Sequence, residues 1–373
     1  MSALGERLRE MIASDGPMPV EQFMMLALSH PTLGYYATRD PLGAAGDFTT
    51  SPEISQMFGE LLGLWAAETW MQMGSPPCVH LVELGPGRGT LMADALRAAR
   101  VCPPFLDTLQ VHLVETSPVL IERQRATLAD AGASPEWHAD IDTLPPGPAI
   151  FLANEFFDAL PVRQFVRTEQ GWCERLVGLD AEHRLTFGIS PAPEPQLATP
   201  APVGAMLEIG AIAYRTTIKI ASRIRREGGA ALFIDYGHTR SGFGETLQAM
   251  SRHRRVDPLA EPGEADLTTH VDFDALKRAA RATGAHVAGP ITQAQLLKSL
   301  GIDQRAGSLK RNASPQQAQD IDAALQRLTS TDPEPGLGER PAPGMGELFK
   351  AMAILHPQLE GSPGFPPLHG AQA

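Results

Sequence analysis

One turn in the sequence has the residue types and spacing to hold a nucleotide-like cofactor. Residues Glu83-Leu84-Gly85-Pro86-Gly87-Arg88-Gly89-Thr90 follow an apolar stretch at 79–82 and precede an amphipathic stretch at 91–99. The first stretch predicts a buried strand and the second a helix, so the glycines lie where the chain turns from sheet to helix. Glycine suits such a turn because it adopts positive φ easily and lets a ligand approach the backbone.

The spacing of this turn separates classes of cofactor. A dinucleotide fold uses G-x-G-x-x-G, and Thr90 occupies the position of its third glycine. The turn also lacks the Gly-Lys-Ser/Thr ending of a triphosphate-binding loop. A carboxylate such as Glu83 before the glycines would repel phosphates but suits an ammonium and a sulfonium group. The pattern favours S-adenosylmethionine, and a glycine turn that binds no ligand is the alternative.

Acidic residues at the ends of two later strands could complete such a site. Glu115 ends the apolar stretch 110–114, one strand-helix-strand unit after the turn. A carboxylate there can accept both hydroxyls of an adenosine ribose. It could also cap the helix that begins near Pro118, and the two roles are compatible. Asp140 and Ile141 follow a third strand, where an acid and an apolar side chain could bind adenine.

Polar side chains also follow the strands predicted at 149–153 and 230–234, namely Asn154, Glu155, Asp158 and Asp235. Ligands of an open parallel sheet bind at the carboxyl ends of its strands, so we expect these side chains near the cofactor. Two alternatives stay open, because Asp158 could cap a turn and Asp235 could anchor a loop.

Composition narrows the class of protein. The chain has 373 residues, of which 43% are hydrophobic and 20% charged, as expected for a globular protein of two domains or of one core with large insertions. The formal net charge of −12 argues against nucleic acid as a partner. No apolar run is long enough for a membrane span and no targeting segment is recognised, so a bacterial cytoplasmic location is expected. Three isolated cysteines and scattered histidines suggest neither a disulfide framework nor a metal site.

The predicted elements divide the chain into consecutive segments. We expect a helical, cofactor-covering segment at 1–74, the first half of the core at 75–161, a β insertion with a Pro-rich linker at 162–206, the second half of the core at 207–292, a helical insertion at 293–343, a last core strand at 344–357 and a disordered tail at 358–373.

Four motifs occur in a fixed order along the chain. They are Gly46-Asp47-Phe48-Thr49-Thr50-Ser51-Pro52-Glu53, the turn from Glu83 to Leu91, Asn154-Glu155-Phe156-Phe157-Asp158-Ala159-Leu160-Pro161 and Asp235-Tyr236-Gly237-His238. Together they resemble the MidA family, which includes the mitochondrial complex I assembly factor seven of eukaryotes. The resemblance runs over most of the chain.

The resemblance implies an α/β class I methyltransferase, Rossmann-like, with a seven-stranded, mostly parallel sheet between helices. It implies S-adenosylmethionine as the cofactor and symmetric dimethylation of an arginine in a respiratory complex I subunit, which would aid assembly of that complex. The mitochondrial location of eukaryotic members is not expected to transfer. The resemblance marks Glu83, Gly85, Gly87 and Glu115 for the cofactor, and it places Gly46 and Asp47 in a segment that closes over it. We add Gly89, Asp140, Ile141 and Asn154 to the expected cofactor residues.

Carboxylates near the sulfonium could hold the guanidinium of an arginine and take up its proton. The candidates are Glu155, which we favour, with Asp158, Asp235 and Asp47. Two other functions stay open. The chain could methylate a small molecule, because this fold serves many acceptors. It could also be an assembly chaperone that keeps a cofactor pocket without turnover.

Overall fold

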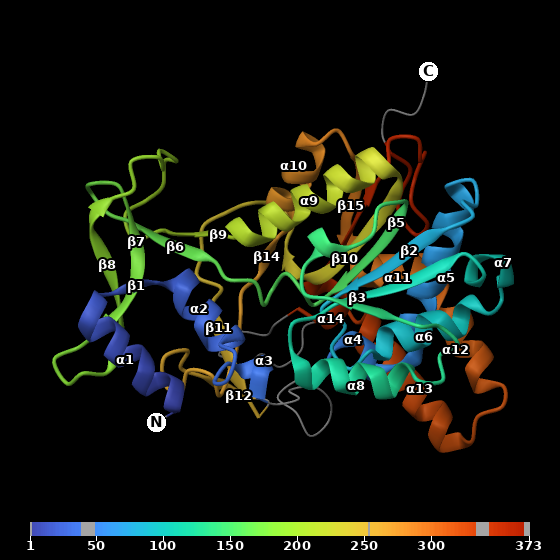
Figure 1. Cartoon of the computed structure of the whole chain (residues 1–373), viewed down its shortest axis with the longest axis horizontal. Coiled ribbons are helices and arrows are strands. Elements are labelled where there is room, and N and C mark those ends of the chain that lie inside the picture. Colours follow the sequence, from blue (N-terminus) through green and yellow to red (C-terminus); the bar gives the residue numbers. More distant parts are fainter. Residues whose placement is uncertain (1, 39–48, 253, 333–342, 369–373) are drawn as a thin grey trace. The chain divides into compact units, whose positions relative to one another are not determined.

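The computed structural model describes residues 2–38, 49–252, 254–332 and 343–368 (Figure 1). They form two compact units, each assembled from segments that are distant in the sequence. The first unit takes segments 1–48, 158–215 and 240–272, and the second takes 49–157, 216–239 and 273–373. The predicted linear segments therefore do not map one to one onto the units, because residues 49–74 pack with the sheet of the second.

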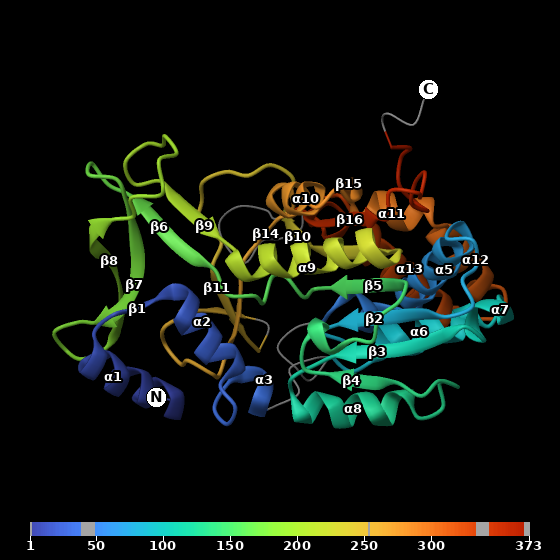
Figure 2. The ribbon, with the colours of Figure 1, turned by 45° about the horizontal axis from the view of Figure 1, so that its top comes forward.

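A mostly parallel sheet forms the centre of the second unit. Its strands are β2 (Val79–Leu84), β3 (Leu109–Val114), β4 (Glu136–His138), β5 (Ala149–Asn154), β10 (Gly229–His238), β15 (His286–Thr292) and β16 (Phe349–Leu355). Among the described residues they follow the order β15-β16-β10-β5-β2-β3-β4. Only β16 runs antiparallel to these neighbours. Figure 2 shows β5, β2, β3 and β4 side by side. The predicted seven-stranded, mostly parallel fold is confirmed.

Helices cover both faces of this sheet. They are α4 (Ser51–Ile54), α5 (Gln56–Gln72), α6 (Thr90–Ala99), α7 (Pro103–Leu106), α8 (Pro118–Leu128), α9 (Ala211–Glu227), α10 (Phe273–Ala282), α11 (Gln293–Ser299), α12 (Ile302–Lys310), α13 (Pro315–Thr329) and α14 (Met345–Leu348). On one face, Ile150 and Leu152 share a core with α5 and α6. On the other, Arg223 of α9 lies over the ring of Phe151. Burial on both faces explains why most residues of the strands are apolar.

The first unit is built on antiparallel strands. These are β1 (Met18–Pro19), β6 (Arg163–Arg167), β7 (Trp172–Leu179), β8 (Leu185–Pro193) and β9 (Met206–Ile209), with a smaller sheet of β11 (Gln248–Ser251), β12 (Arg254–Val256) and β13 (Asp266–Thr268). The short β14 (Val271–Asp272) belongs to the segment of this unit that ends at Asp272 but to neither of these two sheets. Helices α1 (Ala3–Asp15), α2 (Val20–Ser29) and α3 (Tyr35–Thr38) belong to the same unit. Strands β6, β7 and β8 lie within the β insertion predicted at 162–206, and they pair antiparallel.

The described part of the tail differs from its predicted disorder. Trp65 Nε1 donates a hydrogen bond to Ser362 Oγ at 3.0 Å, and Leu359 is buried. Phe365 and Leu368 pack against the core of the second unit. Prolines and glycines gave this segment the composition of a disordered chain, but its few apolar side chains find partners that lie far away in the sequence.

None of the described helices is long and apolar enough to cross a membrane.

Candidate cofactor site

The glycine turn joins β2 to α6 with left-handed backbone at three positions. The φ angles of Gly85, Gly87 and Gly89 are 60°, 54° and 81°. The N–H of Gly85 donates to Val114 O at 3.0 Å, which ties the turn to the end of β3. A Cβ on Gly85 would lie 3.0 Å from the ring of Phe156. Glycine is therefore required here both for conformation and for space.

Glu83 lies at the carboxyl end of β2 and is only 3% exposed. Its carboxylate accepts the backbone N–H of Met92 in the first turn of α6. The other oxygen, Oε2, is buried and has no hydrogen-bond partner in the described part of the chain. Burial raises the pKa of Glu83 well above its usual range, because the charged form loses its hydration.

Asn154, at the tip of β5, provides a second acceptor of this kind. Its Oδ1 is buried and also lacks a partner among the described residues. Strand pairing sets Glu83 opposite Leu152, so Asn154, two residues later, lies on the same face of the sheet. Each unsatisfied buried acceptor costs about 1–3 kcal/mol. A ligand ammonium with three N–H donors would fit two such oxygens at neighbouring strand ends.

Gln124 of α8 connects the glycine turn to the neighbouring strands. Its Nε2 donates to Gly87 O at 2.8 Å and to Glu115 Oε2 at 3.1 Å. Its Oε1 accepts from Trp137 Nε1 at 2.8 Å. Gln124 was not among the site residues predicted from the sequence. The available signal was a polar side chain on the buried stripe of a helix, between Leu120 and Leu128.

Glu115 follows β3 and fills the capping role that the sequence left open. Its Oε1 accepts the N–H groups of Thr116 and Ser117, both at 2.8 Å, at the start of α8. Burial raises its pKa, and these hydrogen bonds oppose that shift. Through Gln124 the carboxylate is linked to Gly87, so the two predicted cofactor residues lie close together.

Asp140 and Ile141 lie in the turn after β4. The Oδ1 of Asp140 accepts the N–H of Asp142, capping a short 3₁₀ helix, η1 (Ile141–Thr143). Lys219 Nζ of α9 lies 3.7 Å from the same oxygen. Asp140 is exposed and Ile141 half-buried, so both remain accessible to a ligand.

Glu155 holds an unusual backbone position at the end of β5. Its φ of 51° is left-handed, which is costly for a residue other than glycine. Its Oε1 accepts the N–H of Ser51, the first residue of α4, at 2.9 Å and Asn154 Nδ2 at 3.0 Å. The carboxylate therefore links the β5 tip to α4, a contact that the sequence does not reveal.

The other predicted catalytic acids are placed differently. Asp235 is 0% exposed, and its two oxygens accept the N–H groups of Phe157 and Tyr236 at 3.0 and 2.9 Å, which fits the loop-anchor alternative. Asp158 is buried in the first unit, where its charge helps to raise the pKa of Tyr36, a shift caused mainly by burial. Gly46 and Asp47 lie outside the described residues.

Glu53, named in the sequence only as the last residue of the first of the four motifs, joins α4 to the glycine turn. Its Oε1 accepts from Thr90 Oγ1 at 2.5 Å, and its Oε2 lies 3.7 Å from Arg88 Nη1. The motif around Ser51 and the glycine turn are therefore side by side in the second unit. In the sequence, the only signal of this proximity was that both segments are among the four motifs.

Comparisons with known proteins agree on one class. Residues 61–291 match a family model described as "Putative S-adenosyl-L-methionine-dependent methyltransferase". A relative from Danio rerio, "Protein arginine methyltransferase NDUFAF7, mitochondrial", is 39% identical, covering 94% of this chain and 86% of the relative. The protein of the same name from Homo sapiens is 37% identical, with 94% and 83% covered.

A solved structure resembles nearly the whole chain. It is a member of the COG1565 superfamily from Burkholderia thailandensis, bound to S-adenosyl-homocysteine. The TM-score is 0.80 at 29% sequence identity, and 97% of this chain and 94% of that chain are covered.

Proposed function

The chain belongs to this family of S-adenosyl-L-methionine-dependent methyltransferases, and from that premise we propose that it methylates an arginine side chain of a protein. The observation that carries the proposal is the similarity, over 94% of the chain, to relatives named protein arginine methyltransferases. We propose symmetric dimethylation of a respiratory complex I subunit, which would aid assembly of that complex. The eukaryotic relatives are named mitochondrial, and we propose the bacterial cytoplasm for this chain.

The site residues fit the parts of the cofactor, which supplies a methyl group on a sulfonium sulfur. We propose that Glu83 and Asn154 accept the ammonium of its methionine part, because each has a buried oxygen without a partner among the described residues. Gly85 and Gly87 would let that part approach the backbone. Glu115 would accept the ribose hydroxyls.

Three further residues belong to the proposed cofactor site. Asp140 and Ile141 would contact the adenine from the turn after β4, where both are accessible. Gly89 would support the site indirectly, because its left-handed backbone begins α6.

Arginine is a poor nucleophile, because its guanidinium is charged and its lone pair is delocalised. Each transfer breaks a carbon–sulfur bond, forms a carbon–nitrogen bond and releases one proton. A carboxylate can hold the guanidinium in a defined orientation and take up that proton. We propose Glu155 for this role, supported by its strained backbone at the carboxyl end of β5. Asp235 would fix the loop that follows Glu155 by binding the N–H of Phe157.

A labelling experiment tests the proposed acceptor. The purified protein is incubated with S-adenosylmethionine carrying a labelled methyl group and with complex I subunits from the same organism. We expect label on a protein, and symmetric dimethylarginine at one site by mass spectrometry. Label confined to small molecules would favour the small-molecule methyltransferase. Calorimetric binding of the cofactor without any labelled acceptor would favour the chaperone.

Replacing Glu115 with Gln should weaken cofactor binding at least tenfold. The amide oxygen can still accept from Thr116 and Ser117, so α8 keeps its cap. The charged acceptor of the ribose hydroxyls is lost, and so is the oxygen that accepts from Gln124 Nε2. Hydrogen bonds to charged groups are each worth about 1.5–3 kcal/mol. Calorimetric titration with S-adenosylmethionine measures the change. Glu122→Gln is the control, because that α8 side chain is 79% exposed. Equal affinity in both variants would contradict the ribose assignment.

A further inference from the structure

Three histidines from neighbouring parallel strands lie in a hydrogen-bonded row, which we call the histidine row: His80 of β2, His112 of β3 and His138 of β4. His80 Nδ1 lies 3.0 Å from His112 Nε2, and His112 Nδ1 lies 3.0 Å from His138 Nε2. Each neutral imidazole has one N–H donor and one lone pair. The two ends of the row therefore decide where the hydrogens are.

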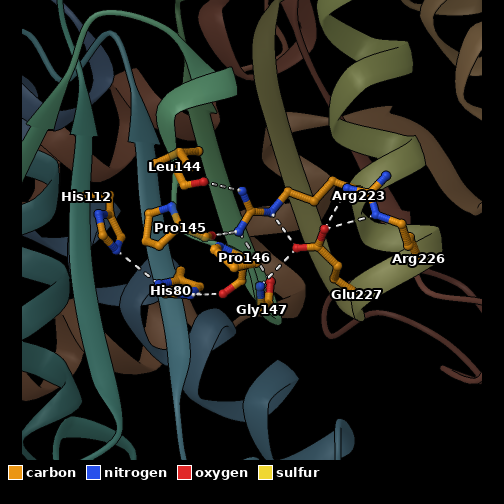
Figure 3. Close-up of polar contacts among 9 residues, drawn as sticks. All are labelled: His80, His112, Leu144, Pro145, Pro146, Gly147, Arg223, Arg226 and Glu227. Carbon is orange, nitrogen blue, oxygen red and sulfur yellow. Dashed lines mark hydrogen bonds and ion pairs between the residues drawn. The ribbon is translucent and has the colours of Figure 1, made fainter.

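The inner end of the row fixes two tautomers. His80 Nε2 lies 3.0 Å from Pro146 O, a carbonyl that can only accept, so Nε2 carries the hydrogen. His80 Nδ1 then has the lone pair and accepts from His112 Nε2. This leaves a lone pair on His112 Nδ1. Figure 3 shows this part of the row, with Arg223 of α9 directed at the backbone carbonyls beside Pro146.

The outer end fixes the third tautomer. Thr143 Oγ1 donates its only hydrogen to Asp140 O at 2.8 Å. His138 Nδ1, 3.0 Å from the same Oγ1, must therefore donate its own hydrogen. This leaves a lone pair on His138 Nε2. Working inward from both ends thus places two lone pairs opposite each other, 3.0 Å apart, between His112 and His138.

One cation between these nitrogens would satisfy both lone pairs and leave the other hydrogen bonds of the row intact. A carboxylate lies close to the same two nitrogens. Glu136 Oε2 lies 3.9 Å from His112 Nδ1, and single ligand atoms of Glu136, His112 and His138 all lie within 4.8 Å of one another. We propose that these three residues bind a divalent transition metal such as Zn²⁺, for which two imidazoles and a carboxylate are a suitable ligand set.

The geometry needs little change to accept the ion. With Zn–N bonds of 2.0–2.1 Å, tetrahedral coordination separates the two nitrogens by about 3.3 Å, a few tenths of an ångström more than the 3.0 Å found here. Glu136 can approach because its side chain is 70% exposed. A cavity of about 440 Å³ has His112 and Glu136 among its lining residues.

The remaining contacts are those expected around a metal site. A metal-bound imidazole usually donates its other N–H to a fixed acceptor. Here His112 would donate to His80, and His138 to Thr143. The nearby positive charge of Arg223 is balanced by Glu227, 3.4 Å away. Because Thr143 holds Asp140 O, the ion would also stabilise the turn that carries Asp140 and Ile141.

Spacing along the chain did not reveal this site. Its ligands come from two strands, and the parallel pairing of His112 with Glu136 brings them together. The interpretation of the histidines as scattered therefore missed a relation that exists only across the sheet.

Calorimetric titration of the full-length, tag-free, metal-free protein with ZnCl₂ tests the proposal. We expect one Zn²⁺ per chain. His138→Gln should weaken binding by about 10²-fold or more. Mutating a residue that only hydrogen-bonds to a metal ligand already lowers metal affinity 10–100-fold, and His138 would be a ligand itself. Glu136→Gln should weaken it about tenfold, and its exposed position keeps ligand loss distinct from unfolding. The control is His183→Asn, at an exposed left-handed position in the other unit that Asn tolerates.

Cobalt provides a second readout. Co²⁺ added to the wild-type chain should give the visible absorption of a tetrahedral site, absent in His138→Gln. The proposal is overturned if the wild-type chain binds no Zn²⁺ at micromolar concentration, or if His138→Gln binds it as tightly as the wild type. A shared proton would then be the cation between the two nitrogens.

Discussion

Replacing Glu155 with Gln is expected to reduce methylation of an arginine-containing protein by about 10²-fold or more while cofactor affinity stays unchanged, a loss of the size of a general-base contribution. The amide oxygen of Gln can still accept from Ser51 N–H and Asn154 Nδ2, so both contacts of Oε1 are preserved. What disappears is the negative charge that would orient the guanidinium and take up its proton. Turnover with labelled cofactor and calorimetric affinity measure the two effects separately.

Glu155→Ala is the matched comparison, because it removes the contacts to Ser51 and Asn154 together with the charge. If Glu155 only positions α4, the Gln variant will keep full activity and only the Ala variant will be impaired. Turnover and thermal unfolding are measured for both variants. Full activity of Glu155→Gln would refute the catalytic role. A fall in cofactor affinity in both variants would instead assign Glu155 to cofactor binding.

Replacing Gly87 with Val is expected to abolish measurable binding of S-adenosylmethionine. The φ of Gly87 is 54°, a conformation that costs about 1–3 kcal/mol for residues with a side chain and more for a β-branched one. Its carbonyl is also held by Gln124, so the turn cannot relax without losing the link to Glu115. In addition, the valine methyl groups would occupy space that the methionine part of the cofactor is proposed to approach.

Gly74→Val separates backbone strain from loss of the site. Gly74 has a similar φ of 81°, and a Cβ there would meet no atom within 4 Å. This variant should lose some stability and keep its cofactor affinity. If Gly87→Val is unfolded, Gly87→Ala adds a smaller side chain to the same backbone and should still bind more weakly than the wild type. If a folded Gly87→Val chain binds S-adenosylmethionine with undiminished calorimetric affinity, the prediction is wrong.

Local sequence patterns were sufficient for the sheet and for the position of the glycine turn. The strands of a parallel sheet buried on both faces are mostly apolar, as are the segments at 79–82, 110–114 and 149–153 in the sequence. The acids Glu83, Glu115 and Glu155 follow from the same logic, because each comes within two residues of the end of such a run. In all three cases the observed strand ends within one residue of the acid.

The partners of those acids could not be predicted, because they belong to residues far away along the chain. Glu155 is 104 positions from Ser51, and Gln124 is 37 positions from Gly87. No periodicity records which helix side chain meets which turn. The same reason explains the tail, where Ser362 pairs with Trp65 across 297 positions.

The sequence by itself determined the class of sheet, the position of the glycine turn and the family, since these depend on residues that are neighbours along the chain. Only the tertiary structure decided that Asp235 anchors a loop, that Asp158 lies in the other unit, and that His112 and His138 face each other. A side chain's role depends on the donors and acceptors that surround it. Those are supplied by the pairing of strands and the packing of helices, which bring together residues that the sequence keeps apart.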